Sequence, residues 1–356
     1  MRILIVKLSS LGDVVHTLPV VQDLHAAFAG AQVDWVIEPA FAPVLAPLVA
    51  AGAVRRVIQC ALRRWRRSFW TAATRAQWRD FTAQLRAEAY DVVIDLQGLS
   101  KSALVARLAR LSPTGQRVAM ANRTQGSGYE AATRWVADLA ITLPVHSPAV
   151  SRGRALAAAA LGYTPQKIPD FGLNRPLART NESSGAIKKV ASEMSCPVVA
   201  LVHGTSRADK AWPLAHWVAL GQRLNAVGFE VALVHGSAIE QASSRSIAAQ
   251  LANAAVWPLL GLDELTVALA GCAGVVGVDS GVSHIAVALG LRHVQLYNFD
   301  TAWRTGPDVL ASGGRQRSVF AQPVPAVDSV WHAWRQTAGA FPAGDADSAA
   351  LTEGPL

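Results

Sequence analysis

Three polar stretches of the chain could carry out chemistry, and each directly follows a short apolar run. In the first, KLSSLGDVVHTLP (residues 7–19), the turn after RILIV offers one glycine, Gly12, and then a carboxylate, Asp13. A strand-to-helix turn that binds phosphate is usually rich in glycine and presents backbone N–H groups. Because a carboxylate repels phosphate, Asp13 either caps the following helix or takes part in chemistry.

The second stretch, VDSGVSHIAVALG (residues 278–290), has the composition of an anion site. Asp279 ends an apolar run, Ser280 and Gly281 form the turn, and His284 lies in the first helical turn. The free amides and the dipole of a helix N-terminus attract anions. The alternative is that Asp279 or Ser280 only caps the helix. A cap needs one such residue, so the group as a whole favours anion binding.

The third stretch, HGTSRADKAWP (residues 203–213), combines two hydroxyls, Thr205 and Ser206, with a flexible cation, Lys210. These groups suit a diphosphate, although the order GxxxxGK[ST] of a P-loop is absent. An ordinary polar loop is the alternative. Further along, Glu240 opens a helical pattern and could bind a ribose, although surface glutamates are common in that position.

An arginine-rich segment distinguishes the first half of the chain. No Asp or Glu occurs between Glu38 and Asp80, and the eight arginines there equal the net charge of +8 of the whole chain. Such a segment attracts phosphate on nucleic acid, on an anionic membrane or on an acceptor, whereas a solvated helix face is the alternative. The interleaved aromatic residues favour an interface. The arginines are Arg55, Arg56, Arg63, Arg64, Arg66, Arg67, Arg75 and Arg79, and the aromatics are Trp65, Phe69 and Trp70.

The order of apolar runs predicts two α/β domains with parallel sheets. Strand-like runs alternate with helical patterns, and the alternation restarts after a Pro-, Ser- and Asn-rich stretch at 164–187 that we interpret as a linker. We therefore expect domains at 1–170 and 171–340, and a disordered tail at 341–356. The predicted strands are 2–6, 33–38, 54–58, 91–96 and 117–120, then 197–204, 230–236, 254–260, 274–281 and 293–297.

This arrangement predicts where the polar stretches meet. Ligands of open α/β sheets bind at the carboxyl ends of the strands, and two such domains enclose a cleft between these edges. LQGLSKS (residues 96–102) adds Gln97 and Lys101 at the same edge of the first domain. One half therefore offers cations and hydroxyls for an anionic leaving group, and the other offers a carboxylate. This division indicates group transfer across a cleft.

Composition excludes several classes of protein. The chain has 356 residues, of which 51% are hydrophobic, but no apolar run approaches the roughly 20 residues of a membrane helix. The N-terminus does not resemble a signal peptide, and three widely spaced cysteines predict neither disulfides nor a zinc site. We therefore expect a cytoplasmic protein. No GxGxxG follows any strand, which argues against a nicotinamide enzyme.

The motifs KLSSLGDVVHTLP, RRWRR, IDLQGLSKS, RADKAWP and VDSGVSH resemble, in this order, those of the ADP-heptose:lipopolysaccharide heptosyltransferases. These enzymes are inverting glycosyltransferases with the GT-B fold of two Rossmann-like domains facing a central cleft. The similarity runs from Met1 to about Gln295. It is strongest to the members that add the first heptose to the Kdo sugar of Kdo-lipid A.

The resemblance implies a role for each candidate residue. Asp13 would be the general base, and no metal or other cofactor would be required. The substrates would be ADP-heptose and Kdo-lipid A, used at the cytoplasmic face of the inner membrane without nucleic acid. The implied donor-binding residues are Thr205, Ser206, Lys210, Glu240, Leu260, Asp279, Ser280, Gly281 and His284. The implied acceptor-binding residues are Arg63, Arg64, Arg66, Arg67, Gln97 and Lys101.

Two regions depart from the family pattern. The family usually continues its last strand into Tyr-Gly-Pro-Thr, whereas here Tyr297 precedes Asn298, Phe299 and Asp300. Residues 122–135 match poorly, so Arg123 or Arg134 is only a candidate for acceptor binding. Two other functions stay open: a related heptosyltransferase acting on a core heptose, and a non-catalytic protein that binds nucleic acid.

Overall fold

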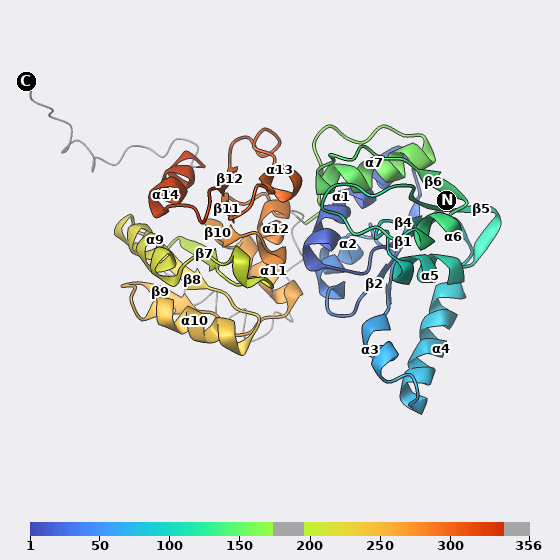
Figure 1. Ribbon diagram of the computed structural model, residues 1–356, viewed down its shortest axis with the longest axis horizontal. Coiled ribbons are helices and arrows are strands. Elements are labelled where there is room, and N and C mark those ends of the chain that lie inside the picture. Colours follow the sequence, from blue (N-terminus) through green and yellow to red (C-terminus); the bar gives the residue numbers. More distant parts are fainter. Residues whose placement is uncertain (174–195, 338–356) are drawn as a thin grey trace, which may run out of the picture.

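Each half of the chain winds around a six-stranded parallel sheet (Figure 1). The computed structural model describes residues 1–173 and 196–337. The first unit contains β1 (Arg2–Val6), α1 (Leu11–Ala27), β2 (Gln32–Ile37), η1 (Ala42–Leu45), α2 (Ala46–Ala50), β3 (Arg56–Gln59), α3 (Leu62–Arg67), α4 (Ala72–Arg86), β4 (Tyr90–Asp95), α5 (Ser100–Leu108), β5 (Leu111–Met120), α6 (Ala132–Val136), β6 (Leu139–Ile141) and α7 (Ala149–Leu161).

The second unit repeats this pattern. It contains β7 (Val198–Val202), η2 (Ala208–Lys210), α9 (Leu214–Ala226), β8 (Glu230–Leu233), α10 (Ala238–Ala248), β9 (Ala254–Val256), α11 (Leu262–Ala270), β10 (Gly274–Val278), α12 (Gly281–Ala288), β11 (His293–Tyr297), α13 (Ala302–Thr305), β12 (Gln316–Phe320) and α14 (Val327–Gln336).

The two sheets share one topology. Their strand orders are β3-β2-β1-β4-β5-β6 and β9-β8-β7-β10-β11-β12, and neighbouring strands of both sheets in the described residues run parallel. In such a sheet the winding reverses between the first and fourth strands, and the crevice at this switch point is where ligands bind. The switch points lie between β1 and β4 and between β7 and β10. All three polar stretches identified in the sequence leave one of these strands.

The strand predictions are correct in most places, and the deviations have local causes. The predicted strand 254–260 ends at Val256, because Pro258 has no N–H to offer a sheet. The strand predicted to run to 281 ends at Val278, because Ser280 caps the next helix instead. From its position in the sequence, Pro19 is expected either to kink the first helix or to start its main body; in the structure it lies inside α1, which begins at Leu11.

Two edge strands were missed. β6 (Leu139–Ile141) is short and only half buried, and β12 (Gln316–Phe320) carries polar residues at its start, so neither gives an apolar signal. The predicted strand 117–120 extends back to Leu111 as β5, and the predicted strand 54–58 is Arg56–Gln59. Of the predicted linker, 164–173 is described, whereas 174–187 and the tail lie outside the described residues.

One apolar cluster runs continuously from the first unit into the second, where α1 meets α12. The contact depends on two glycines. A Cβ on Gly12 would lie 2.7 Å from Cδ2 of His284, and a Cβ on Gly281 would lie 2.7 Å from Cγ of Leu11. Real Cβ atoms do not approach so closely, so only glycine allows this approach. The first turns of α1 and α12 therefore touch across the gap between the units.

The arginine-rich segment divides in the structure. Arg55 binds the fully buried Asp34 with two hydrogen bonds of 2.7 and 3.0 Å, and Arg56 lies 3.7 Å from the same carboxylate. These two arginines compensate a buried charge in the first sheet and do not contribute to a surface patch. The other six lie on α3, α4 and their immediate surroundings. No helix in the described ranges has the length and apolar character to cross a membrane.

We predict that Gly12→Val lowers the stability of the chain by about 1–3 kcal/mol, because the added side chain overpacks the contact with His284. Thermal unfolding measures the change. Gly153→Ala is the matched control, since its Cβ would meet its nearest neighbour, Val20 Cγ2, at 3.6 Å, an ordinary contact. Unfolding of Gly12→Val at the wild-type temperature would contradict this account of the α1–α12 packing.

Candidate active site

Asp13 lies in the first turn of α1, at the switch point of the first sheet. Its Oδ2 accepts hydrogen bonds from the backbone N–H (3.1 Å) and the hydroxyl (2.9 Å) of Ser10, and its Oδ1 lies 4.0 Å from Lys7 Nζ. The side chain keeps 39% of its surface exposed. Asp13 therefore does help to cap the helix, yet it remains open on one side to a ligand.

The surroundings of Asp13 keep it ionised. Burial alone would raise the pKa of this carboxyl, but the nearby Lys7 ammonium and the hydrogen bonds from Ser10 lower it to about 2. Lys7 is itself buried, which lowers its pKa, and its ammonium donates to Leu96 O at 3.0 Å. Asp13 is thus a carboxylate at neutral pH and can accept a proton but cannot donate one.

The other candidates of the first unit surround the loop that carries Asp13. Gln97 Oε1 accepts from the backbone N–H groups of Leu8 and Ser9, both at 3.0 Å, so this amide oxygen fixes the loop. Lys101 Nζ donates to Ser9 Oγ at 2.9 Å. The ammonium also lies 3.3 Å from Glu38, a carboxylate that the sequence analysis did not identify.

Glu38 gathers two of the predicted acceptor-binding cations. Its Oε1 lies 3.3 Å from Lys101 Nζ and 3.3 Å from Nε of Arg63. The carboxylate is largely buried at the end of β2, so it holds both cations at the mouth of the first switch point. Its position at the end of a predicted strand was the signal available in the sequence.

In the second unit, Asp279 contacts two basic side chains. Lys210 Nζ lies 2.5 Å from its Oδ2, and His284 Nε2 lies 3.4 Å from its Oδ1. Burial alone would raise the pKa of Asp279, but the hydrogen bond from His284 and the pair with Lys210 hold it well below its usual value. Asp279 therefore positions an ammonium and an imidazole side by side at the second switch point.

Ser280 and Gly281 begin α12. Ser280 is its N-cap, since Oγ lies 3.5 Å from the backbone N of Ser283, so the capping alternative holds for this residue. The N–H groups of Gly281 and Val282 have no acceptor within the helix, as in the first turn of any helix, and such groups attract anions. Gly281 is needed for the approach of Leu11 described above. Capping and anion binding are thus compatible here.

The remaining donor candidates lie along the same edge of the second sheet. Glu240 opens α10, accepts from the backbone N–H of Gly236 at 2.6 Å and packs over Gly204 at the end of β7. Thr205 follows directly, and Ser206 is exposed beside it. Leu260 is half buried between β9 and α11 against the cluster that joins the units. The structure therefore brings every predicted donor residue to one edge.

His16 connects the two halves of the site. Its ring centroid lies 4.2 Å from that of His284, and it senses both Asp13 and Asp279 electrostatically. Burial and the neighbouring His284 lower the pKa of His16 well below its usual value, so the ring is neutral at pH 7. The spacing of His16, one turn after Asp13, is also compatible with simple packing, and in the structure its ring packs against that of His284.

The poorly matching region 122–135 does not supply a buried cation. Arg123 and Arg134 are both exposed. Arg152 on α7 was not identified from the sequence, yet burial lowers its pKa and the Asp13 carboxylate opposes that shift. Because Arg152 and Asp13 lie 139 positions apart in the chain, no local sequence pattern predicts that they are close. Arg152 is therefore an additional cation near Asp13.

The unusual residue Asn298 has a defined role. Its Nδ2 donates to the backbone carbonyls of Asp209 and Ala211, both at 3.0 Å, on either side of Lys210. The side chain is buried. A glycine, the usual family residue at this position, could not make these bonds. Asn298 therefore fixes the loop that carries Lys210, and the departure from the family pattern was the signal that marked it.

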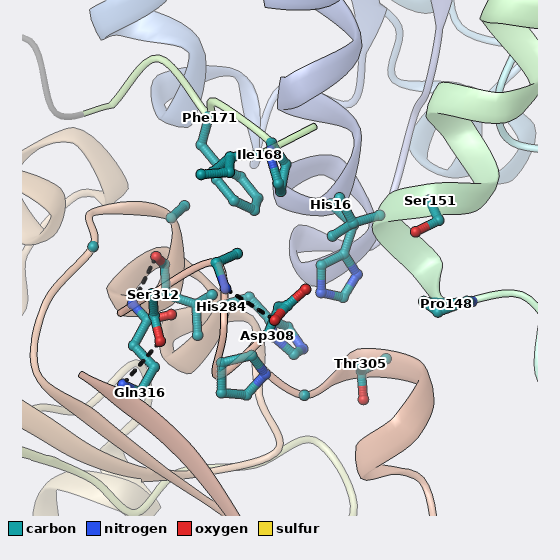
Figure 2. A pocket seen from close by; sticks show the side chains of 18 of the residues that line it. His16, Pro148, Ser151, Ile168, Phe171, His284, Thr305, Asp308, Ser312 and Gln316 are labelled. Atoms are coloured by element: carbon teal, nitrogen blue, oxygen red, sulfur yellow. Dashed lines mark hydrogen bonds between the residues drawn. The ribbon is translucent and has the colours of Figure 1, made fainter. Parts of the chain in front are cut away.

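A pocket of about 550 Å³ lies between the units, on a wall shared by His16 and His284 (Figure 2). Its other walls come from the start of α7, residues 167–171 and the segment from α13 to Gln316. Asp13, Lys210 and Asp279 do not line it, but His16 and His284 do, so the pocket adjoins the candidate site. Across residues 1–173 and 196–337, no three His, Cys, Asp or Glu side chains are grouped to hold a metal ion.

Comparison with known proteins decides the family. The sequence model of glycosyltransferase family 9 (heptosyltransferase) matches residues 78–314. The chain belongs to this family. It is therefore a glycosyltransferase with the GT-B fold of two facing Rossmann-like units. A non-catalytic nucleic-acid-binding protein, one of the two alternatives, is wrong.

Individual relatives agree with this assignment. Lipopolysaccharide heptosyltransferase 1 of Pseudomonas aeruginosa is 37% identical over 326 residues, covering 89% of this chain and 82% of that protein. The enzyme of the same name from Escherichia coli K12 is 35% identical over 329 residues, covering 91% and 94%. The solved structure of E. coli heptosyltransferase WaaC with ADP superposes with a TM-score of 0.80 at 30% identity, covering 95% of this chain and all of that one.

We predict that Asn298→Gly lowers kcat/KM for the sugar nucleotide by up to about thirtyfold, because two hydrogen bonds worth about 1 kcal/mol each no longer hold the Lys210 loop. Steady-state kinetics at varied donor concentration measure the loss. Asn298→Asp is the matched control, because it keeps the volume but removes the N–H donor. If the aspartate variant behaved as wild type, the bulk of the side chain and not its hydrogen bonding would matter.

Proposed function

We propose that this glycosyltransferase moves heptose from ADP-heptose to the Kdo sugar of Kdo-lipid A, with inversion, in the synthesis of the lipopolysaccharide inner core. The observation that carries the proposal is the placement of an ionised carboxylate, Asp13, opposite a cationic helix N-terminus across the α1–α12 contact. The relatives named lipopolysaccharide heptosyltransferase 1 and the neighbour solved with ADP support heptose transfer from an ADP-sugar to lipopolysaccharide.

The second unit is the donor side in this proposal. Lys210, the amides at the start of α12 and His284 stabilise the diphosphate as the bond between the anomeric carbon and the phosphate oxygen breaks. Thr205 and Ser206 donate hydrogen bonds to the phosphates. Glu240 holds the ribose, and Leu260 lines the adenine site. ADP departs as an anion against groups that Asp279 already holds in place.

The first unit supplies the attacking side. The Kdo hydroxyl oxygen forms its bond to the anomeric carbon on the face opposite ADP, and its proton passes to Asp13, so that the configuration inverts. Lys101, Gln97 and the arginines of the RRWRR motif orient the anionic acceptor. Arg63 and Lys101 are already gathered by Glu38.

A carboxylate whose pKa is about 2 is a weak base, yet it suffices for this reaction. The transition state is oxocarbenium-like, so the acceptor oxygen becomes strongly acidic as it bonds to carbon. Its proton then moves downhill even to a weakly basic carboxylate. Because the protein supplies the positive charge at the diphosphate, we also propose that transfer needs no metal or other cofactor.

The proposed acceptor is a lipid, which places the enzyme at a membrane surface. We propose that the chain works as a peripheral protein at the cytoplasmic face of the inner membrane of a Gram-negative bacterium. Arg55 and Arg56 bind Asp34, so six arginines of the segment remain exposed or at the cleft. Their positive charge supports this location.

The decisive experiment incubates the purified chain with ADP-heptose and either Kdo-lipid A or an acceptor that already carries one heptose. Release of ADP and the mass of the product report transfer. We expect product only with Kdo-lipid A. Product only with the heptosylated acceptor would favour the related heptosyltransferase, and no product with either would refute the proposed function.

We predict that Asp13→Asn slows transfer by about a hundredfold to ten-thousandfold and leaves the affinity for ADP within about twofold. Because the pKa of Asp13 is about 2, the wild-type carboxylate is ionised throughout neutral pH. The factor lost should therefore be the same at about pH 6 and about pH 8. Single-turnover rates and ADP titration provide the two measurements.

Ser10→Ala separates catalysis from helix capping. This variant removes the hydroxyl that donates to Asp13 but keeps the carboxylate, so we expect only a small decrease in rate. A loss in Ser10→Ala as large as in Asp13→Asn would indicate that Asp13 acts through the structure of the loop. Loss of ADP affinity in Asp13→Asn would also count against its assignment as the base.

A further inference from the structure

The helical hairpin of α3 and α4 projects from the first unit, away from both sheets (Figure 1). Its base is at the predicted cleft, where Arg63 contacts Glu38 and Ser9. Its tip is the turn Ser68–Thr71, beyond the end of α3, and six residues of helix span roughly 9 Å. The tip is therefore displaced from the residues proposed to carry out transfer.

The hairpin is held together by its own contacts. Trp65 is buried, with its ring centroid 5.7 Å from that of Trp78 and 5.4 Å from that of Phe81. Gln77 Oε1 accepts from Trp65 Nε1 at 2.9 Å and from Arg64 Nη2 at 3.0 Å. These contacts join α3 to α4 along their inner faces, so the hairpin presents its tip on an ordered support.

The turn at the tip satisfies its polar groups internally. Thr71 caps α4 through the N–H of Thr74 at 3.2 Å, and its hydroxyl donates to Ser68 O at 3.0 Å. The hydroxyls of Ser68 and Thr74 are 2.9 Å apart. Two large apolar side chains are left outward: Trp70 is 88% exposed and Phe69 is 48% exposed. Nothing in the fold of this unit requires them there.

The tip is also cationic. Arg66 and Arg67 are exposed, and their side chains make no hydrogen bond or ion pair within the described part of the chain. Arg75 and Arg79 are exposed on α4. No acidic residue lies between Glu38 and Asp80 to neutralise them. The tip therefore combines two exposed aromatic side chains with unpaired arginines. This combination complements a surface with an anionic outer layer and an apolar interior.

We propose that Phe69 and Trp70 insert into the interfacial region of an anionic phospholipid bilayer while the neighbouring arginines contact the anionic headgroups there, those of the lipid acceptor included. Aromatic side chains favour this depth of a membrane, and arginines near an anionic surface add attraction that salt weakens. The inference rests on the proposed function in that the docked hairpin brings the mouth of the cleft to a lipid-linked acceptor. It assigns Phe69 and Trp70 to the bilayer itself and not to the acceptor.

The test measures binding of the full chain to vesicles by flotation. We expect binding to phosphatidylcholine vesicles that contain about 30 mol% phosphatidylglycerol, weaker binding to phosphatidylcholine alone, and a decrease with rising salt. The double variant Phe69→Ser, Trp70→Ser should bind the anionic vesicles at least about tenfold more weakly. Wild-type binding by this double variant, or equal binding of the wild type to both kinds of vesicle, would overturn the proposal.

Leu310→Ser is the matched control, because Leu310 is 92% exposed but belongs to the second unit. It should bind vesicles as the wild type does. If Leu310→Ser lost as much binding as the double variant, a general loss of surface hydrophobicity would explain both, and the assignment to the hairpin tip would fail. Because all three side chains are exposed, we expect unchanged thermal unfolding in these variants.

Turnover separates docking from chemistry. With an acceptor stripped of its acyl chains, the double variant should match the wild type, whereas with Kdo-lipid A in anionic vesicles it should be several-fold slower. A slower reaction with the acyl-free acceptor would place the tip in acceptor binding and overturn the proposal. If the wild type used neither acceptor, the proposed function would fail, but the flotation result would still decide whether the tip docks. Tight binding of an oligonucleotide that competes with vesicles would point to nucleic acid instead.

Discussion

The whole site depends on the close packing of two helix N-termini across the gap between the units. Gly12 makes room for His284, and Gly281 makes room for Leu11, so the first turns of α1 and α12 come into contact. These turns carry the proposed base and the proposed anion site. Backbone approach sets the separation of these two turns, so the carboxylate faces the N-terminus of α12, while Asp279 holds the longer side chain of Lys210 in place.

Buried carboxylates hold the basic side chains of the site in place. Asp279 holds Lys210 and His284, and Glu38 holds Lys101 and Arg63. A cation that is already oriented loses less side-chain entropy when a phosphate binds. The carboxylates also prevent the cations from repelling one another in the unliganded cleft. In both units, therefore, a buried carboxylate orients basic side chains. In the second unit these side chains face the departing group, and in the first unit they face the acceptor.

Much of the fold followed from local patterns. The buried strands of a parallel sheet read as short apolar runs, which is why the central strands of both sheets were found while the half-buried edge strands β6 and β12 were not. The arginine count misled in part, because it could not show that Arg55 and Arg56 face the buried Asp34. Charge along a sequence does not reveal which partners lie across a sheet.

The sequence by itself determined the chemical inventory: a carboxylate after the first strand, cations and hydroxyls after two strands of the second half, and the family motifs that contain them. Tertiary structure decided what each member touches. The contact of His16 with His284, the proximity of Arg152 to Asp13 and the support of Lys210 by Asn298 all join residues far apart along the chain. Local patterns report which side an element buries, but distances between elements arise only when the two units pack, so these roles became visible only in the fold.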